Sequence, residues 1–279
     1  MAEVTRVSNL ASRLLSFRSD RPLVVGIVNV TPNSFSDGGR FLDGAEAIAH
    51  GLKLRDEGAD LVDVGGESTR PGAQPVPADE ELRRVIPVIE ALVRDGVTVS
   101  VDTLKPEVMR AAIAAGCAAV NDVNGFRSPG AIEAVAQSDV GLVVMHMQGT
   151  PQTMQEAPHY DDVVSEVRSF LASRVCVLEA AGVASDRIVL DPGFGFGKTF
   201  EHNKQLFRAL PALASMGYPV LAGVSRKRMI GELTGRRTED RVAGSVAAAL
   251  LAVQNRASLV RVHDVKETVD AIKVWMELK

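Results

Sequence analysis

The feature that most constrains this chain is a series of eight short apolar runs, nearly all of which stop at a polar residue. Runs of about four to eight apolar residues are typical of strands buried on both faces, as in a parallel sheet. The runs cover residues 23–28, 61–64, 97–101, 118–120, 142–145, 188–190, 220–224 and 259–262. In α/β barrels the chemistry lies at the carboxyl ends of such strands. The pattern therefore predicts a fold and also the end of it that holds the site.

The segments between the runs carry the signals of helix ends. A glycine stands one to a few residues before each of five runs, where a helix would end in a left-handed residue. These glycines are Gly58, Gly96, Gly116, Gly182 and Gly217. The order strand, loop, helix, strand, repeated eight times, predicts a parallel sheet closed into a (β/α)8 TIM barrel. We expect residues 1–279 to form this single domain, with residues 1–22 as a short N-terminal cap.

Helix starts are marked as well. Pro106 and Pro129 suit a first helical turn. Asp161 is expected to open a long helix. Asp264, with Glu267 three residues later, resembles a capping box in which Asp takes the place of Ser or Thr.

Length, charge and cysteine content narrow the class of protein. A chain of 279 residues is ordinary for one α/β barrel. The net charge of −4 argues against a general nucleic-acid or membrane-surface binder, and no run approaches the roughly 18 apolar residues of a membrane span. Cys117 and Cys176 form no metal-binding spacing, and residues 1–20 do not resemble a signal peptide. We expect a cytoplasmic protein with neither nucleic acid nor membrane as a partner.

The strand ends offer the groups that a polar, planar ligand needs. Carboxylates and amides follow several strands, and basic side chains follow others. The candidates are Asn29, Asp102, Asn121, Asp191, Lys227, Arg261 and His263. Acidic and amide edges suit a flat heterocycle with several N–H and C=O groups, because each buried polar edge requires a partner. Arg261 and His263 lie two residues apart on one face of a strand, so both can reach an oxyanion such as phosphate. A lone aspartate at a strand end is as often a helix N-cap, so the inference depends on the whole set.

Long loops follow three of the strands. Residues 31–41 and 66–78 follow adjacent strands and are rich in glycine, proline and serine, and an irregular stretch, 148–160, follows the fifth run. Long loops in a compact domain are usually lids or binding loops, although one such loop alone is as well explained as a slack surface connection. We expect the first two to take part in binding.

Two further features have both a functional and a structural interpretation. The glycine-rich stretch 193–199 lacks the spacing of a phosphate-binding P-loop, because Pro192 stands where its first glycine belongs. We expect a tight loop that lets backbone approach a planar ligand, with Phe196 available to lie on it. For His146, a buried or rim histidine with satisfied hydrogen bonds is favoured over a catalytic one.

Eight stretches resemble the dihydropteroate synthase family, the folate-pathway enzymes that sulfonamides target, in their chromosomal bacterial form. They are residues 26–39 (GIVNVTPNSFSDGG), 63–72 (DVGGESTRPG), 100–103 (SVDT), 121–122 (ND), 145–149 (MHMQG), 191–198 (DPGFGFGK), 225–227 (SRK) and 261–264 (RVHD). The resemblance extends from about residue 22 to the end of the chain, and the first two motifs are the most specific.

The resemblance implies a reaction. The family joins 6-hydroxymethyl-7,8-dihydropterin diphosphate to p-aminobenzoate, giving 7,8-dihydropteroate and diphosphate. Diphosphate leaves first, in an SN1-like step, and the amine then attacks. The cofactor is Mg²⁺, and family members are usually homodimers.

The resemblance also implies site residues. Positions that correspond to the pterin site are Asp102, Asn121, Met145, Asp191, Phe196, Gly223 and Lys227. Positions that correspond to the diphosphate and Mg²⁺ site are Asn29, Thr69, Arg70, Arg261 and His263, with Asn29 as the direct metal ligand. The p-aminobenzoate and sulfonamide pocket corresponds to Phe35, Thr69, Arg70, Pro71, Ser225 and Lys227. The residues expected to be catalytic are Asp102, Lys227, Arg261 and His263.

One position departs from the family pattern. Many members have Ser after Ser-Arg-Lys, where its hydroxyl helps to hold the p-aminobenzoate carboxylate, but this chain has Arg228. The backbone at the helix start, or Arg228 itself, could take over that contact.

Two alternatives remain from the sequence. A methyltetrahydrofolate:corrinoid methyltransferase-type barrel would share the pterin-edge residues but would have no use for the Arg261/His263 site. A non-catalytic pterin-binding paralogue would keep the pocket and lack the reaction.

Overall fold

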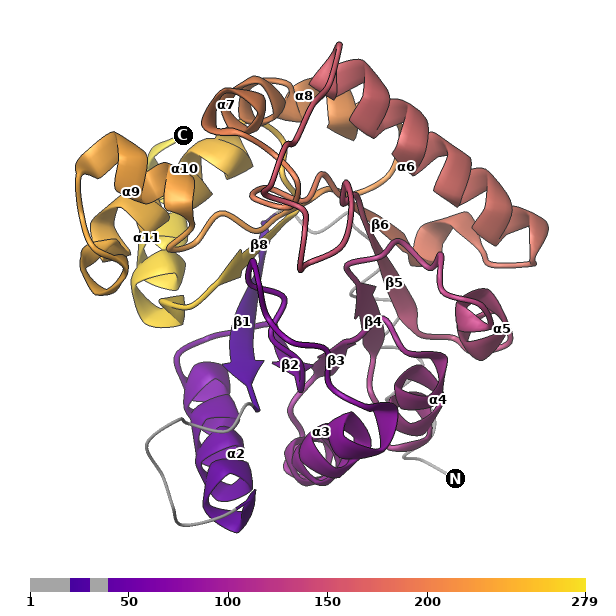
Figure 1. The fold of residues 1–279 in the computed structure, drawn as a ribbon. Helices are drawn as coiled ribbons and strands as arrows, with labels where there is room; N and C mark the ends of the chain where they lie inside the picture. Colours follow the sequence, from indigo (N-terminus) through magenta and orange to yellow (C-terminus); the bar gives the residue numbers. More distant parts are fainter. Residues whose placement is uncertain (1–20, 31–39) are drawn as a thin grey trace.

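The computed structural model describes residues 21–30 and 40–279, with side chains from residue 44 onward in the second range, and these form a parallel barrel ringed by helices (Figure 1). The strands are β1 (Leu23–Asn29), β2 (Leu61–Gly65), β3 (Val99–Asp102), β4 (Ala119–Asp122), β5 (Gly141–Met145), β6 (Ile188–Asp191), β7 (Leu221–Ala222) and β8 (Leu259–Val262). Their order in the sheet is β6-β5-β4-β3-β2-β1-β8-β7. A single parallel bridge between Leu190 and Val220 joins β6 to β7. The predicted (β/α)8 TIM barrel is therefore confirmed, whereas most of the expected N-terminal cap lies outside the described residues.

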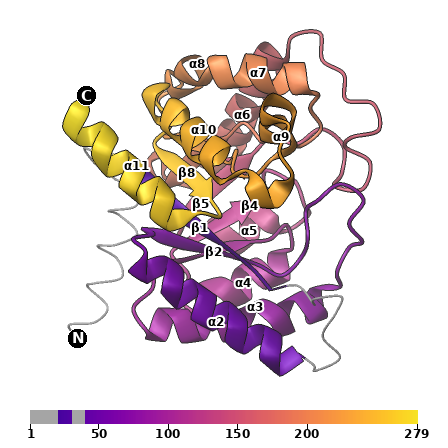
Figure 2. The ribbon, with the colours of Figure 1, turned by 90° about the vertical axis from the view of Figure 1, so that its left-hand side faces the viewer.

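Helices follow the strands and pack on the outside of the barrel (Figures 1 and 2). The α-helices are α2 (Arg40–Asp56), α3 (Ala78–Arg94), α4 (Pro106–Ala114), α5 (Ala131–Val135), α6 (Val163–Ala180), α7 (Phe200–Arg208), α8 (Leu210–Ala214), α9 (Arg228–Thr234), α10 (Val242–Gln254) and α11 (Val265–Leu278). Two short 3-10 turns, η1 (Ser185–Arg187) and η2 (Thr238–Asp240), complete the set. In the side view of Figure 2, the loops after β2 and β5 extend from the same end of the barrel. Among the described residues, no helix is long and apolar enough to cross a membrane.

The helix ends largely follow the sequence signals. All five predicted glycines have a positive φ, between 77° and 100°. Pro106 opens α4 as predicted. The Pro129 prediction is wrong, because α5 begins at Ala131, after Gly130 in the left-handed conformation.

The start of α6 is displaced by one residue from the prediction. The cap is Asp162 rather than Asp161, and its carboxylate accepts hydrogen bonds from the backbone N–H groups of Val164 and Ser165 at 3.0 and 3.1 Å. Glu166 accepts the N–H groups of both aspartates through Oε1. Two adjacent aspartates offer the same signal in sequence, and only the backbone geometry distinguishes them.

The lower end of the barrel interior, at the amino-terminal ends of the strands, is apolar. Leu23 is level with Leu259, and Val25 is level with Leu61. Side chains from six strands form a closed cluster there: Leu23, Val25, Leu61, Val143, Val189, Leu221 and Leu259. A larger apolar core lies between the strands and the helices, to which α3 contributes Val85, Ile89 and Leu92. The barrel is thus packed below, and its open end is the carboxyl one.

The upper end of the interior is polar. Two residues beyond Leu61 on β2, Asp63 is level with Ser100 of β3. Asp102 of β3 is in turn level with Asn121 of β4. Because side chains alternate along a strand, these residues point into the barrel like the apolar ones below them. The register therefore gathers polar groups at the predicted end.

Candidate active site

Asp63 is the centre of a buried polar network at the upper end of the barrel. Its Oδ1 accepts a hydrogen bond from Ser100 Oγ at 2.6 Å. Its Oδ2 accepts from Asn121 Nδ2 at 3.1 Å and from Arg261 Nε at 2.6 Å. Asp63 is only 1% exposed, so this ion pair is shielded from water. The network holds Asn121 and Arg261 in fixed orientations.

Arg261 also joins Asp102 to this network, and two acceptor atoms remain open. Arg261 Nη2 donates to Asp102 Oδ2 at 2.8 Å. Asp102 Oδ1 and Asn121 Oδ1 are buried and have no hydrogen-bond partner among the described residues. Buried acceptors normally have partners, so these two oxygens call for a ligand with N–H donors. Burial raises the pKa of Asp102 to about 7 against the opposing effect of Arg261.

Asp191 and Lys227 complete the charged part of the site. Asp191 Oδ1 accepts a hydrogen bond from Gly193 N at 2.7 Å, and burial raises the pKa of this carboxyl. Burial lowers the pKa of Lys227 to about 8, although Asp191 opposes the shift. Lys227 Nζ donates to Phe194 O and lies 4.3 Å from the centre of the Phe196 ring. The predicted pterin-edge groups thus lie on neighbouring strand ends.

An apolar cluster lies beside these charges. Its buried members are Val123, Met145, Met147 and Met154, with Leu104 and Phe196 packed against them. Gly223, which is also predicted to belong to the pterin site, follows β7. A Cβ at this position would lie 3.9 Å from Arg261 Cβ. A flat ring with polar edges needs both kinds of surface.

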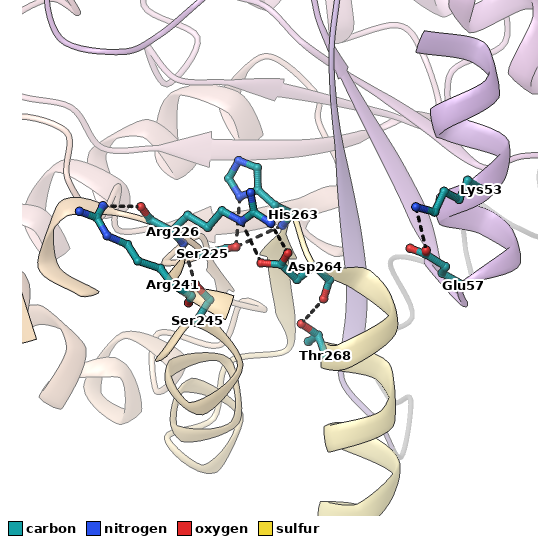
Figure 3. Close-up of polar contacts among 9 residues, drawn as sticks. All are labelled: Lys53, Glu57, Ser225, Arg226, Arg241, Ser245, His263, Asp264 and Thr268. Atoms are coloured by element: carbon teal, nitrogen blue, oxygen red, sulfur yellow. Dashed lines mark hydrogen bonds and ion pairs between the residues drawn. The ribbon is translucent and has the colours of Figure 1, made fainter. Parts of the chain in front are cut away.

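The segment that follows β7 contacts the segment that follows β8 through two neighbouring pairs of residues (Figure 3). Ser225 Oγ lies 3.1 Å from His263 Nδ1 and accepts a hydrogen bond from His263 N at 3.2 Å. Arg226 forms an ion pair with Asp264. Burial, Arg261 and Arg226 together lower the pKa of His263 to about 4. In the site as the structure describes it, the neutral form of His263 is therefore favoured at pH 7.

The same ion pair corrects a second prediction. Asp264 occupies the N-cap position of α11, but its side chain makes no capping hydrogen bond. Its carboxylate is held by Arg226, whose Nε donates to Oδ2 at 3.0 Å. A charged donor competes more strongly for a carboxylate than backbone N–H groups do. Arg226 has a left-handed φ of 55°, and Arg241 Nη1 and Ser245 Oγ bind its backbone oxygen and nitrogen, each at 2.9 Å.

The loop after β2 carries three more predicted residues. Thr69 is half-buried, whereas Arg70 and Pro71 are exposed. The loop contacts the segment after β5, since Gly72 N donates to Pro151 O at 3.2 Å and Gln152 Nε2 donates to Ala73 O at 3.2 Å. Phe35, which is predicted to line the same p-aminobenzoate pocket, lies outside the described residues.

The glycine-rich loop is tight, as predicted, and it packs against a neighbouring loop. Gly193, Gly195 and Gly197 all have a positive φ. A Cβ on Gly193 would lie 1.9 Å from the carbonyl oxygen of His146, and one on Gly197 would lie 2.5 Å from that of Gln148. At Gly193 and Gly197, close packing against the protein's own backbone therefore requires glycine.

The side chains around this loop confirm the structural interpretation of His146. Lys198 is 3% exposed, and its Nζ lies 2.9 Å from His146 Nδ1 and donates to Phe196 O at 3.0 Å. Burial lowers the pKa of both groups. The other side of His146 lines a cavity of about 450 Å³ between the loop after β5 and the first turns of α6. This cavity is lined by none of the strand-end carboxylates, so it is not the candidate active site.

The predicted Mg²⁺ site has one candidate protein ligand, Asn29. Within residues 21–30 and 44–279, no three His, Cys, Asp or Glu side chains are grouped to hold a metal ion. Asn29 is exposed at the carboxyl end of β1 and offers one hard oxygen. One such ligand fits Mg²⁺, which usually keeps several waters and takes further oxygens from substrate phosphates.

Asp63 and Ser100 are the residues that sequence reasoning missed. Asp63 is not among the predicted strand-end residues because it interrupts an apolar run instead of ending it. An inward-facing aspartate inside a buried strand was itself the signal, since a buried charge requires a partner.

Comparison with known proteins agrees with this arrangement. A family model described as "Pterin binding enzyme" matches residues 25–263. Dihydropteroate synthase from Neisseria meningitidis serogroup C is 52% identical over 264 residues, which cover 93% of each chain. Dihydropteroate synthase from Xanthomonas albilineans has been solved with 4-aminobenzoic acid, at 60% identity, a TM-score of 0.88 and 93% coverage of each chain.

Two further solved structures show ligands of interest. The Xanthomonas albilineans enzyme has also been solved with 7,8-dihydropteroate, with a TM-score of 0.84, 57% identity and coverage of 93% of this chain and 94% of that one. The Yersinia pestis enzyme, in a complex with a sulfonamide drug, has a TM-score of 0.86, 46% identity and coverage of 92% and 93%. On the strength of the family match and these identities, the chain belongs to the pterin binding enzyme family and, within it, to the dihydropteroate synthases.

Proposed function

We propose that this chain joins 6-hydroxymethyl-7,8-dihydropterin diphosphate to p-aminobenzoate at the carboxyl end of its barrel. The observation that carries the proposal is the pair of buried, unpartnered acceptors, Asp102 Oδ1 and Asn121 Oδ1. A pterin presents N–H donors along one edge, so it would satisfy both oxygens at once. Asp191 and Lys227 would bind the rest of its polar edge, and Met145, Phe196 and Gly223 would contact its faces.

The diphosphate would lie toward β8 and β1. His263 is neutral there, so it would act as a hydrogen-bond donor. Arg261 already forms ion pairs with two carboxylates, so its attraction for a substrate phosphate would be partly offset by their negative charge. Asn29, Thr69 and Arg70 would supply the remaining contacts. Asn29 would also hold Mg²⁺, which when bound neutralises charge on the diphosphate.

The chemistry needs charge stabilisation more than a nucleophile. The bond between the pterin CH₂ carbon and the diphosphate oxygen breaks, and its electron pair leaves with the diphosphate. The electron-rich ring stabilises the resulting cation, which the amine of p-aminobenzoate then attacks before losing a proton. Asp102, a carboxylate next to the ring, would favour the cation, while Lys227, Arg261 and His263 would stabilise the departing charge.

The p-aminobenzoate pocket would form between two loops. Thr69, Arg70 and Pro71 come from the loop after β2, Ser225 and Lys227 come from the segment that follows β7, and Phe35 would complete the pocket. The Ser225 hydroxyl is engaged by His263, so its contribution would be to orient that histidine. Arg228 is exposed and pairs with Glu232 at 2.6 Å, so its guanidinium would be available to the p-aminobenzoate carboxylate only if that pair opened.

Three expectations accompany this function. Sulfonamides should compete with p-aminobenzoate, as the drug complex of the Yersinia pestis relative suggests. The family resemblance supports a homodimer, which sedimentation equilibrium would test. The same resemblance supports a cytoplasmic location.

Diphosphate release measured with and without p-aminobenzoate tests the proposal. We expect diphosphate release to be coupled to dihydropteroate formation, and sulfamethoxazole should inhibit the reaction competitively with p-aminobenzoate. Pterin binding without release in either condition would contradict it and favour a non-catalytic paralogue. Methyl transfer from methyltetrahydrofolate to a corrinoid would instead identify the methyltransferase alternative.

A further inference from the structure

A buried cluster of charges lies behind the loop that follows β2, outside the site described above. Lys105 Nζ donates to Glu67 Oε2 at 2.5 Å and also to Glu81 Oε2. The side chains are 15%, 10% and 0% exposed for Lys105, Glu67 and Glu81. Such an ion pair is shielded from solvent, so breaking it leaves an uncompensated charge.

Glu67 also closes the loop on itself. The same Oε2 atom that binds Lys105 accepts a hydrogen bond from Val76 N at 2.9 Å. Residues 67 and 76 are thereby held together, and residues 68–75, which include Thr69, Arg70 and Pro71, project between them. Gly66 presses the start of the loop onto α3, because a Cβ there would lie 2.7 Å from Val85 Cγ1 and 2.9 Å from Glu81 Cγ.

Lys105 ties this loop to the strand that carries Asp102. It lies three residues beyond Asp102 and forms the N-cap of α4, and its backbone N–H donates to Thr103 Oγ1 at 3.2 Å. On the other side, Arg84 of α3 donates to Gly66 O at 2.9 Å. One ammonium group thus connects α3, the loop after β2 and the segment after β3.

We infer that Glu67, Lys105 and Glu81 form a clamp that positions the loop 68–75 over the second-substrate pocket. These are positioning residues, because none of them belongs to the candidate pocket itself. The clamp sets the place of Thr69 and Arg70 relative to Asp102, so it determines how well p-aminobenzoate binds while leaving the pterin ring's contacts untouched. The inference depends on the proposed function for the identity of the second substrate.

Glu67→Gln is the most direct test, since it removes one of the two negative charges that Lys105 binds, the one that belongs to the loop, and keeps the size of the side chain. We expect the KM for p-aminobenzoate to rise about tenfold or more, with a smaller change in kcat. Binding of 6-hydroxymethyl-7,8-dihydropterin, measured by calorimetry, should stay within about twofold. Hydrogen exchange at the Val76 amide should accelerate, while exchange in β1 should not.

Matched variants separate positioning from general stability. Asp79→Asn removes an exposed ion pair with Arg83 on the same helix and should change none of these readouts. Lys105→Arg keeps the charge and should retain more p-aminobenzoate affinity than Lys105→Met. If Lys105→Met does not fold, Glu67→Gln alone decides.

Two results would overturn the clamp. One is an unchanged KM with unchanged exchange at Val76 in Glu67→Gln. The other is an equal loss of pterin and p-aminobenzoate binding, which would show a merely structural role. Failure of the wild-type chain to form dihydropteroate would instead reject the proposed function, and the exchange measurement would still test the clamp.

Discussion

The two ends of the barrel interior use the same strands for opposite purposes. At the lower end, Leu61 of β2 packs in a closed apolar cluster. Two residues later on the same strand, Asp63 binds Ser100, Asn121 and Arg261. One strand therefore provides an apolar packing residue at one level and a binding-site residue at the next.

The two levels also differ in their energetics. Burying an apolar side chain contributes roughly 1.5–3 kcal/mol. A buried ion pair is often no more stabilising than apolar residues of the same volume, yet removing one partner is costly. The apolar lower level therefore stabilises the barrel. The polar upper level contributes less to stability but holds its charged groups in fixed positions for a ligand.

Arg261→Met should have the largest effect, because it leaves Asp63 and Asp102 buried without their cation. We expect a loss of about 3–5 kcal/mol in the free energy of unfolding, measured by urea denaturation, together with loss of dihydropteroate formation. Replacing Arg256, an exposed arginine, by Met serves as the control. An unchanged free energy of unfolding in Arg261→Met would show that the charged network does not contribute to stability.

Leu61→Ala probes the lower level in the same strand. Truncating this buried leucine should cost about 2–5 kcal/mol in unfolding free energy. Because the upper level is untouched, kcat/KM measured well below the melting temperature should stay close to the wild-type value. A large loss of activity in the folded variant would mean that the two levels are not separable.

Lys227→Ala addresses the upper level without breaking the central network. Turnover should fall on the order of 10²-fold, by analogy with the loss of a preorganised charge stabiliser. Since burial lowers the pKa of this lysine to about 8, its charged form is disfavoured in the folded state, and stability should not fall with activity. A variant within about threefold of wild type in a steady-state assay would remove Lys227 from the site.

The smallest expected effect concerns His263. Its pKa of about 4 keeps it neutral across the working range. Affinity for the pterin diphosphate should therefore show no step attributable to His263 between pH 5.5 and 8.5, as judged by comparing wild type with His263→Gln. A step near pH 6.5 that the variant lacks would show that a protonated histidine binds the diphosphate.

The comparison also explains what the sequence can predict. Hydrophobic runs and glycine punctuation are local signals, so they predict the barrel, its helices and the polar strand ends. The pairing of Arg261 with Asp63 joins residues 198 positions apart, and no local pattern indicates it. Asp264 shows the converse, because its local capping signal is overridden by Arg226, which lies 38 positions away in sequence.

The glycine-rich loop marks a further boundary of prediction. Its composition predicts close backbone approach, and the structure has that approach. The partner is the backbone at His146 and Gln148, which only the packing of two loops reveals. The sequence thus predicts that this loop makes a tight backbone contact, whereas the fold determines which segment it contacts.

The most direct test of the account is the unfolding free energy of Asp102→Asn against wild type at pH 5 and pH 8, with activity measured in parallel. The folded pKa of Asp102 is about 7, above its ordinary value, so wild-type stability should fall as pH rises from about 4 to 7. We expect the variant to be nearly as stable as wild type at pH 5, relatively more stable at pH 8, and inactive in dihydropteroate formation. A variant that is less stable at pH 8 and retains its activity would contradict the division between a packing level and a binding level.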